Sequence, residues 1–187
     1  MERRSWDRQA RKVFRPAMIE AEGLRSVVIL RDLSTAGAGL KVVGRSAPLL
    51  AGQDITLDWG SHPVAGTVKW ARDDRIGLEF EDQVDIASLS LRPVRVPLKI
   101  PASLYVRGQE HDCEIVNLSQ HGLGVASDVD IAEGSLASLN SSGLDLQSLS
   151  MRWSDDHRQG MSMSSSLSIP AFSAIVDRIS QRSAAPA

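Results

Sequence analysis

The sequence predicts an all-β protein made of two tandem, small, six-stranded antiparallel β-barrels, with a helix at the C-terminal end. Three observations lead to this expectation: a turn motif occurs twice, short apolar runs alternate with turn residues, and no convincing amphipathic helix separates the runs of the first half. Short strands joined by tight turns pair with their neighbours, and they close into a barrel when no helix covers the sheet.

The repeated turn motif lies in the stretch 31–40 and recurs in the stretch 116–125. Asp32, Ser34, Gly37 and Gly39 correspond to Asn117, Ser119, Gly122 and Gly124, all at an offset of 85 positions (117 − 32). Asx and Ser side chains cap nearby backbone N–H groups, and Gly permits a positive φ. The motif therefore predicts a tight loop between two strands, and its repetition predicts a duplicated domain.

The offset divides the 187 residues into two domains, which we expect at 1–90 and 91–187. Each is small, roughly 90 residues, but large enough to fold alone.

The strands are predicted from short apolar runs bounded by turn residues. In the first half they cover 14–22, 26–31, 39–43, 54–58, 63–70 and 76–80, and in the second half 99–106, 113–116, 124–127 and 149–153. The hairpin from Trp153 to Gly160 matches that from Trp70 to Gly77, now at an offset of 83 (153 − 70).

Three segments interrupt this regular plan. Residues 82–91 are expected to form a short helical turn between the halves, and the weak periodicity of 136–149 and the Ser-rich run 161–166 indicate that the second copy has drifted. Apolar residues at helical spacing predict a C-terminal helix over 169–179, which could lie across a barrel mouth.

Composition indicates an ordinary globular protein, with 42% hydrophobic and 24% charged residues and a net charge of −2. This balance argues against a general binder of nucleic acid polymers. No apolar run is long enough to insert into a membrane, and the first residues lack the apolar core of a signal peptide, so we expect a cytoplasmic protein. Cys113 is the single cysteine and is expected to be a buried strand thiol.

No residue pattern in the sequence indicates catalysis or metal binding. The histidines His62, His111, His121 and His157 are scattered and form no metal-binding motif. Asp73-Asp74 and Asp155-Asp156 lie at hairpin tips, where Asp favours the turn. We therefore expect no enzymatic activity, no catalytic residue, no metal and no cofactor.

Basic residues crowd the first fifteen positions, namely Arg3, Arg4, Arg8, Arg11, Lys12 and Arg15. One interpretation is a solvated N-terminal arm, and the other is a local site for an anion.

This arm and the turn motif together resemble the PilZ family, the bacterial receptor domains for cyclic di-GMP. The family signature is R-x-x-x-R followed by [D/N]-x-S-x-x-G. Arg11 to Arg15 supply the first element, Arg4 to Arg8 supply it in an alternative register, and 32–37 supply the second. The late W…G…F pattern of 70–80 is similar to the family as well.

The resemblance implies a non-enzymatic receptor that binds cyclic di-GMP and relays this to a protein partner. Its implied ligand residues are Arg11, Arg15, Asp32, Ser34 and Gly37, with Arg4 and Arg8 as the alternative register. An Arg fork can donate two parallel hydrogen bonds to a phosphate or to guanine O6 and N7, and its plane can stack on a base.

The second copy keeps the loop but has no strict R-x-x-x-R, because Arg95 has Leu91 four positions before it and Lys99 four positions after it. Lys cannot reproduce the planar fork. The expectation is that the N-terminal domain binds the ligand and that the second domain serves as a partner or homodimer surface. The alternative is a ligand-independent PilZ-like interaction scaffold.

Overall fold

The computed structural model describes residues 10–44, 49–60, 63–86 and 92–184, the last four of these by their backbone alone. Contacts divide the chain into two compact units. The first consists of Met1–Val94 together with Ile169–Ala187, and the second is Arg95–Ser168.

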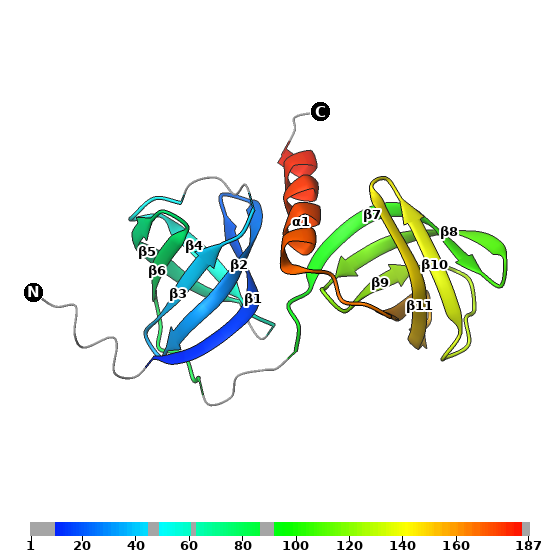
Figure 1. The fold of residues 1–187 in the computed structure, drawn as a ribbon, viewed down its shortest axis with the longest axis horizontal. Coiled ribbons are helices and arrows are strands. Elements are labelled where there is room, and N and C mark those ends of the chain that lie inside the picture. Colours follow the sequence, from blue (N-terminus) through cyan, green and yellow to red (C-terminus); the bar gives the residue numbers. More distant parts are fainter. Residues whose placement is uncertain (1–9, 45–48, 61–62, 87–91, 185–187) are drawn as a thin grey trace, which may run out of the picture. The chain divides into compact units, whose positions relative to one another are not determined.

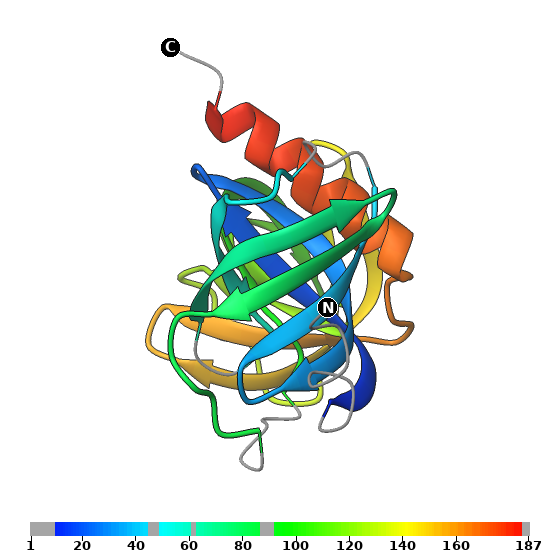
Figure 2. The ribbon, with the colours of Figure 1, turned by 90° about the vertical axis from the view of Figure 1, so that its left-hand side faces the viewer.

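The first unit contains a closed six-stranded antiparallel barrel (Figures 1 and 2). Its strands are β1 (Arg11–Ala21), β2 (Leu24–Ser34), β3 (Gly37–Val42), β4 (Asp54–Asp58), β5 (Val64–Arg72) and β6 (Arg75–Phe80), in the order β1-β2-β3-β6-β5-β4. Alternate side chains of these strands point inward and form one apolar core, as the two-residue period of a strand requires. Trp59 and Phe80 pack in this core with ring centroids 6.1 Å apart.

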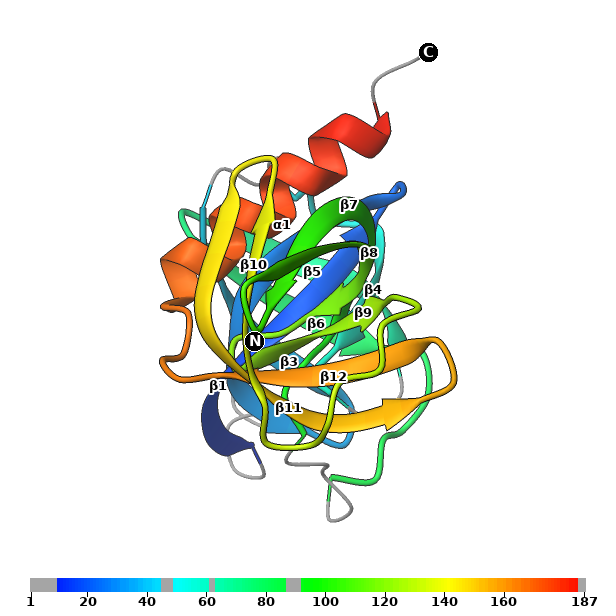
Figure 3. The ribbon, with the colours of Figure 1, turned by 90° about the vertical axis from the view of Figure 1, so that its right-hand side faces the viewer.

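The second unit is a closed barrel with the same strand pairing (Figure 3). Its strands are β7 (Val96–Val106), β8 (Gln109–Leu118), β9 (Gly122–Ala126), β10 (Leu136–Ser141), β11 (Leu144–Asp155) and β12 (Arg158–Met163). The predicted tandem of six-stranded barrels is confirmed. The drifted segments are nevertheless strands β10 and β12, because Ala137, Leu139 and Met161 still alternate inward.

A β-bulge at the same position in both barrels reflects the duplication. The pairing of β1 with β2 shifts between Lys12 and Arg15, and that of β7 with β8 shifts between Pro97 and Ile100, both 85 positions later. A bulge bends and twists a strand locally, so both barrels bend at the same place before their Ser-containing turn.

The helix α1 (Ile169–Ala184) packs against β2 of the first unit. Phe172 and Val176 are buried, while Ser173 Oγ donates to the carbonyl of Val43 (2.9 Å) and Ser180 Oγ donates to the carbonyl of Arg25 (3.1 Å). A division of the chain at residue 90 alone would group this helix with the second barrel, whereas its contacts are with the first.

The helical turn expected at 82–91 is absent from 82–86, and 87–91 lie outside the described residues. Within the described part of the chain, no helix has the length and apolar character needed to cross a membrane.

Candidate functional site

The turn between β2 and β3 is closed by the side chain of Ser34. Its hydroxyl donates to the carbonyl of Gly37 (3.1 Å) and accepts from the N–H of Ala36 (3.4 Å). Only 9% of Ser34 is exposed. The hydroxyl therefore holds the loop in shape, because both of its hydrogen bonds are made within the turn.

The turn between β8 and β9 is built in the same way. Ser119 Oγ donates to the carbonyl of Gly122 (3.0 Å) and accepts from the N–H of His121 (3.3 Å). The geometry of the Ser-containing loop is thus common to both barrels, and it does not by itself distinguish a binding loop from a structural one.

The glycines of the two turns do not adopt the positive φ that their sequence context predicts. None of Gly37, Gly39, Gly122 and Gly124 has a positive φ. Position 39 instead requires a glycine because of close approach, since a Cβ there would lie 3.0 Å from Oδ2 of Asp32. Likewise, a Cβ on Gly122 would collide with the carbonyl of Met161.

Asp32 belongs to a row of four paired residues that crosses the outer face of the first barrel. Asp32 on β2 pairs with Gly39 on β3, Gly39 pairs with Gly77 on β6, and Gly77 pairs with Trp70 on β5. The Trp70 indole lies over Gly77, where a Cβ would collide with it, and the residue is 50% exposed. We call these four residues the glycine row; the Asp32 carboxylate lies over Gly39 and the Trp70 indole lies over Gly77.

The second barrel has a corresponding row, formed by Asn117, Gly124, Gly160 and Trp153. Here Arg95 Nη1 donates to Oδ1 of Asn117 (2.8 Å). In the first barrel, by contrast, no described residue donates a hydrogen bond or forms an ion pair with the Asp32 carboxylate. Among the described residues, the Asx side chain of the row therefore has no partner in the first barrel and has Arg95 as its partner in the second.

The structure separates the two arginines of the Arg11 to Arg15 motif. Arg11 is exposed and pairs with Leu33, next to Asp32. Arg15 pairs with Leu30 on the other side of the bulge, and its Nη2 donates to the carbonyl of Arg92 (2.5 Å). Burial lowers the pKa of Arg15 from its ordinary value. The residues of the alternative register, Arg4 and Arg8, lie outside the described residues.

The carbonyl that Arg15 contacts belongs to a segment packed on the first barrel. Gly60 adopts a φ of 96°, and a Cβ there would collide with the backbone of Arg92. Val94, two residues later, is buried. Arg15 therefore connects β1 to the chain that leads into the second barrel.

Two residues beside Asp32 were not singled out by sequence reasoning. Phe14 lies in the β1 bulge with 60% of its surface exposed, and the guanidinium carbon of Arg31 lies 5.7 Å from the centroid of its ring. The available signal was an aromatic residue next to Arg15 in the basic arm and an arginine immediately before the Asp32 motif.

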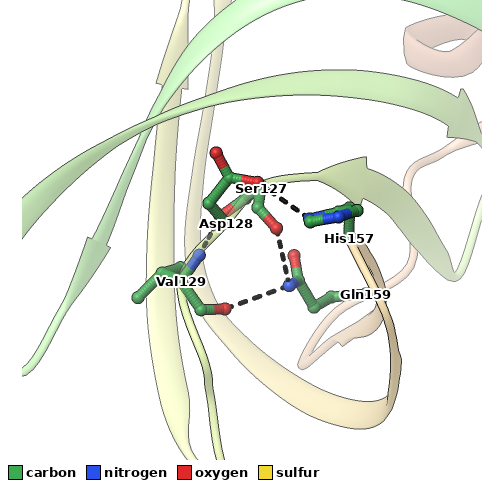
Figure 4. A network of polar contacts seen from close by, with 5 residues as sticks. All are labelled: Ser127, Asp128, Val129, His157 and Gln159. Carbon is green, nitrogen blue, oxygen red and sulfur yellow. Dashed lines mark hydrogen bonds and ion pairs between the residues drawn. The ribbon is translucent and has the colours of Figure 1, made fainter.

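A polar network of the second barrel fixes the loop after β9 (Figure 4). Gln159 Nε2 donates to the carbonyls of Ser127 (3.1 Å) and Val129 (3.0 Å), and the N–H of Val129 donates to Ser127 Oγ (3.1 Å). His157 Nδ1 lies 2.9 Å from Oδ1 of Asp128, and both side chains are largely exposed. This network shapes the loop, and the contact between His157 and Asp128 adds little because both side chains are solvated.

Gln159 occupies a position equivalent to a core residue of the first barrel. At the offset of 83 it corresponds to Ile76 (159 − 76), which is buried in the first core. Gln159 is itself only 1% exposed, and its Oε1 has no hydrogen-bond partner among the described residues. The second barrel has therefore exchanged an apolar core contact for hydrogen bonds to its own loop.

Cys113 lies on β8 and is half-buried, so the expected burial is only partial. Desolvation by burial, followed by the charge of Asp112, raises the pKa of its thiol to about 11. In the described part of the chain, no group of three or more His, Cys, Asp or Glu side chains could hold a metal ion.

The fold and the paired rows define a protein of two duplicated barrels, each carrying an Asx-x-Ser turn on its outer face. The chain belongs to the PilZ domain family, whose model matches residues 2–92 and again 90–153. No curated protein matches the sequence.

Several solved structures are similar to this chain at low identity. Borreliella burgdorferi PlzA in complex with c-di-GMP is 12% identical over 88% of this chain and 86% of its own, with a TM-score of 0.37. The Bacillus subtilis inhibitor of motility MotI/DgrA is 14% identical over 94% and 100%, with a TM-score of 0.39. Escherichia coli YcgR in complex with c-di-GMP is 16% identical over 89% and 80%, with a TM-score of 0.33.

Proposed function

We propose that this protein is a cytoplasmic, non-enzymatic receptor for cyclic di-GMP whose first barrel binds the ligand and whose second barrel serves a protein partner. The observation that carries the proposal is the Asp32 carboxylate, which no described residue pairs with, at the end of the glycine row on a loop held by Ser34 and Gly37. Membership of the PilZ family and the c-di-GMP complexes of PlzA and YcgR support the choice of ligand.

The glycine row suits a dianionic ligand with two flat purine bases. Gly39 makes room for the Asp32 carboxylate and Gly77 makes room for the half-exposed Trp70 indole, so the row presents a hydrogen-bond acceptor and an aromatic ring to a base. The Asp32 carboxylate can accept hydrogen bonds from the N1–H and exocyclic amine of guanine, and charge-assisted hydrogen bonds of this kind are strong. In this proposal Ser34 and Gly37 act by positioning Asp32.

The difference between the two barrels supports ligand binding by the first. Arg95 already holds Asn117 in the second barrel, so a ligand there would have to break that hydrogen bond. Asn117 is also neutral and lacks the charge that strengthens an acceptor.

Arginines from the N-terminal segment complete the proposed site in one of two registers. In the first, Arg11 is exposed beside the turn, but Arg15 must leave the Arg92 carbonyl to reach the ligand. In the second, Arg4 and Arg8 bind the ligand and Arg15 keeps its contact.

The contact between Arg15 and Arg92 also supports the relay to a partner. If the ligand captures Arg15, the carbonyl of Arg92 loses this donor, which removes one contact of the segment that enters the second barrel. Binding energy would then be converted into a change in that segment, as a coupling between two sites requires.

The same contact favours a second candidate function, a ligand-independent interaction scaffold. Within the described residues, Arg15 serves a structural hydrogen bond, and Arg92 lies in a segment anchored by Gly60. A barrel that uses its arginine to hold its own chain has no need of a ligand for this purpose.

Calorimetric titration of the full chain with cyclic di-GMP separates the two candidates. The receptor is supported by saturable binding that is weakened by Asp32→Ala, and the scaffold by no heat of binding at all. The paired variants Arg11→Ala with Arg15→Ala, and Arg4→Ala with Arg8→Ala, identify the register. Each lost bidentate contact should cost about 1 to 3 kcal/mol.

A further inference from the structure

Phe14 combines three unusual properties in a residue next to the proposed site. It is a large apolar side chain with 60% of its surface exposed, it adopts a φ of 50°, and it contacts the guanidinium of Arg31. A bulky residue with positive φ is strained, and such strain persists where the surrounding structure enforces it, often at ligand sites. Nothing in the core of the barrel requires this conformation, because the side chain points to solvent.

The position of Phe14 and Arg31 relative to Asp32 follows from strand pairing. Lys12 pairs with Asp32 and Arg15 pairs with Leu30, so Phe14 lies in the bulge opposite Arg31. Arg31 precedes Asp32 directly in the chain, and the pairing of β2 with β3 shifts at the same point. The aromatic ring and the guanidinium therefore stand at the Asp32 end of the glycine row.

The second barrel provides an internal comparison, because it keeps the bulge but not this pair. At the shared offset of 85, Phe14 corresponds to Lys99 and Arg31 to Val116. Lys99 does not have a positive φ. The bulge thus forms without strain when no aromatic is presented, which indicates that the strain in the first barrel is not a requirement of the fold.

Arg31 also carries a charge that the described residues leave uncompensated. No described carboxylate lies within ion-pair distance of its guanidinium, which lies over the Phe14 ring. A guanidinium held against an aromatic ring keeps its N–H donors at the edge, where they can meet a planar acceptor.

We propose that Phe14 and Arg31 form a guanine-recognising wall of the first barrel's site, in which the Phe14 ring stacks on a base of the ligand and Arg31 donates to guanine O6 and N7. This rests on the proposed function and adds two binding residues to it. The roles differ in chemistry: every base has a π-face for Phe14, whereas the acceptor pair that fits Arg31 belongs to guanine.

Titration of the full chain with cyclic di-GMP and with cyclic di-AMP tests both roles. Phe14→Ala should weaken cyclic di-GMP binding roughly 5- to 150-fold, the range that loss of one stacked base implies. Arg31→Lys keeps the charge but not the fork, so it should weaken cyclic di-GMP binding more than cyclic di-AMP binding and narrow the preference between them. Phe14→Gly, which accommodates the positive φ, should lose affinity while unfolding at the same denaturant concentration as the wild type or a higher one.

Leu50→Ala and Lys99→Ala are the matched controls. Leu50 is an apolar residue of the first unit that is 67% exposed, against 60% for Phe14, and Lys99 is the counterpart of Phe14 in the second barrel. Both should bind like the wild type. The proposal is overturned if the wild type binds cyclic di-GMP and either Phe14→Ala or Arg31→Lys binds it within twofold of the wild type. A wild type that does not bind at all overturns the proposed function, and this inference with it.

Discussion

Asp32 and Gly39 pair across β2 and β3, and a Cβ on Gly39 would stand 3.0 Å from Oδ2 of Asp32. The carboxylate thus rests over a residue that has no side chain. In the second barrel Asn117 lies over Gly124 in the same manner. The orientation of the Asx side chain therefore depends on a glycine of the neighbouring strand.

Gly39→Ala is expected to reduce cyclic di-GMP affinity far more than stability. The new methyl group displaces the flexible carboxylate at little cost to the fold, but a displaced Asp32 loses a charge-assisted hydrogen bond of about 1.5 to 3 kcal/mol, roughly a 10- to 100-fold loss. Calorimetric titration and urea unfolding of the same preparation measure the two effects. Gly124→Ala is the control, and an equal loss of affinity in both variants would contradict the assignment of the site to the first barrel.

Asp32→Ala is expected to weaken binding, whereas Asn117→Ala should leave affinity unchanged. The physical reason is that the Asp32 carboxylate has no hydrogen-bond partner among the described residues, while Asn117 already accepts from Arg95. Titration of both variants of the full chain provides the measurement. If Asn117→Ala binds cyclic di-GMP more weakly than Asp32→Ala, the ligand site would have to be assigned to the second barrel.

Ser34→Ala and Ser119→Ala are expected to destabilise their barrels by similar amounts. Each removes a hydroxyl that donates to a glycine carbonyl within its turn, at 3.1 Å and 3.0 Å, and loss of a buried partner costs about 1 to 3 kcal/mol. Urea unfolding measures the loss. Only Ser34→Ala should also weaken cyclic di-GMP binding, and a destabilisation confined to one variant would refute the common role of the two serines.

Arg15→Ala is expected to lower stability without ligand, while Arg11→Ala should not. Arg15 donates to the carbonyl of Arg92, and losing this bond should cost about 1 kcal/mol, whereas Arg11 is exposed. Thermal unfolding of the two variants in the absence of nucleotide checks this. Limited proteolysis near Arg92 gives a second measurement, because this segment should be cleaved faster in Arg15→Ala than in the wild type.

Cys113 is expected to react slowly with thiol reagents in the folded protein. Burial raises the pKa of the thiol from 9.0 to about 11, so little thiolate is present at pH 8. The folded state thereby favours the protonated thiol, and this contribution to stability is present below pH 9 and is lost as the pH rises toward 11. Labelling should accelerate sharply in denaturing urea, and equal rates in both conditions would contradict the prediction.

Much of the fold could be predicted from the sequence because local chemistry repeats. The Asx-x-Ser-x-x-Gly turn and the hairpin after each Trp recur at nearly constant offsets, and turn residues bound the apolar runs that become strands. Strands β10 and β12 were harder to predict, because serines such as Ser138 and Ser162 weaken the alternation of apolar and polar side chains along them. The alternation becomes visible only when the barrel buries the apolar neighbours of these serines.

The sequence by itself determined the duplication, the barrel class and the position of the Asp32 turn, because these depend on residues close together in the chain. Only the tertiary structure decided which residues stand beside that turn. Strand pairing aligns Gly39, Gly77 and Trp70 with Asp32, and it sets the bulge that presents Phe14 to solvent. Packing likewise directs Arg15 to Arg92 and Arg95 to Asn117. Partners that lie 77 and 22 positions apart come together only when the barrels close, so no local spacing could reveal them.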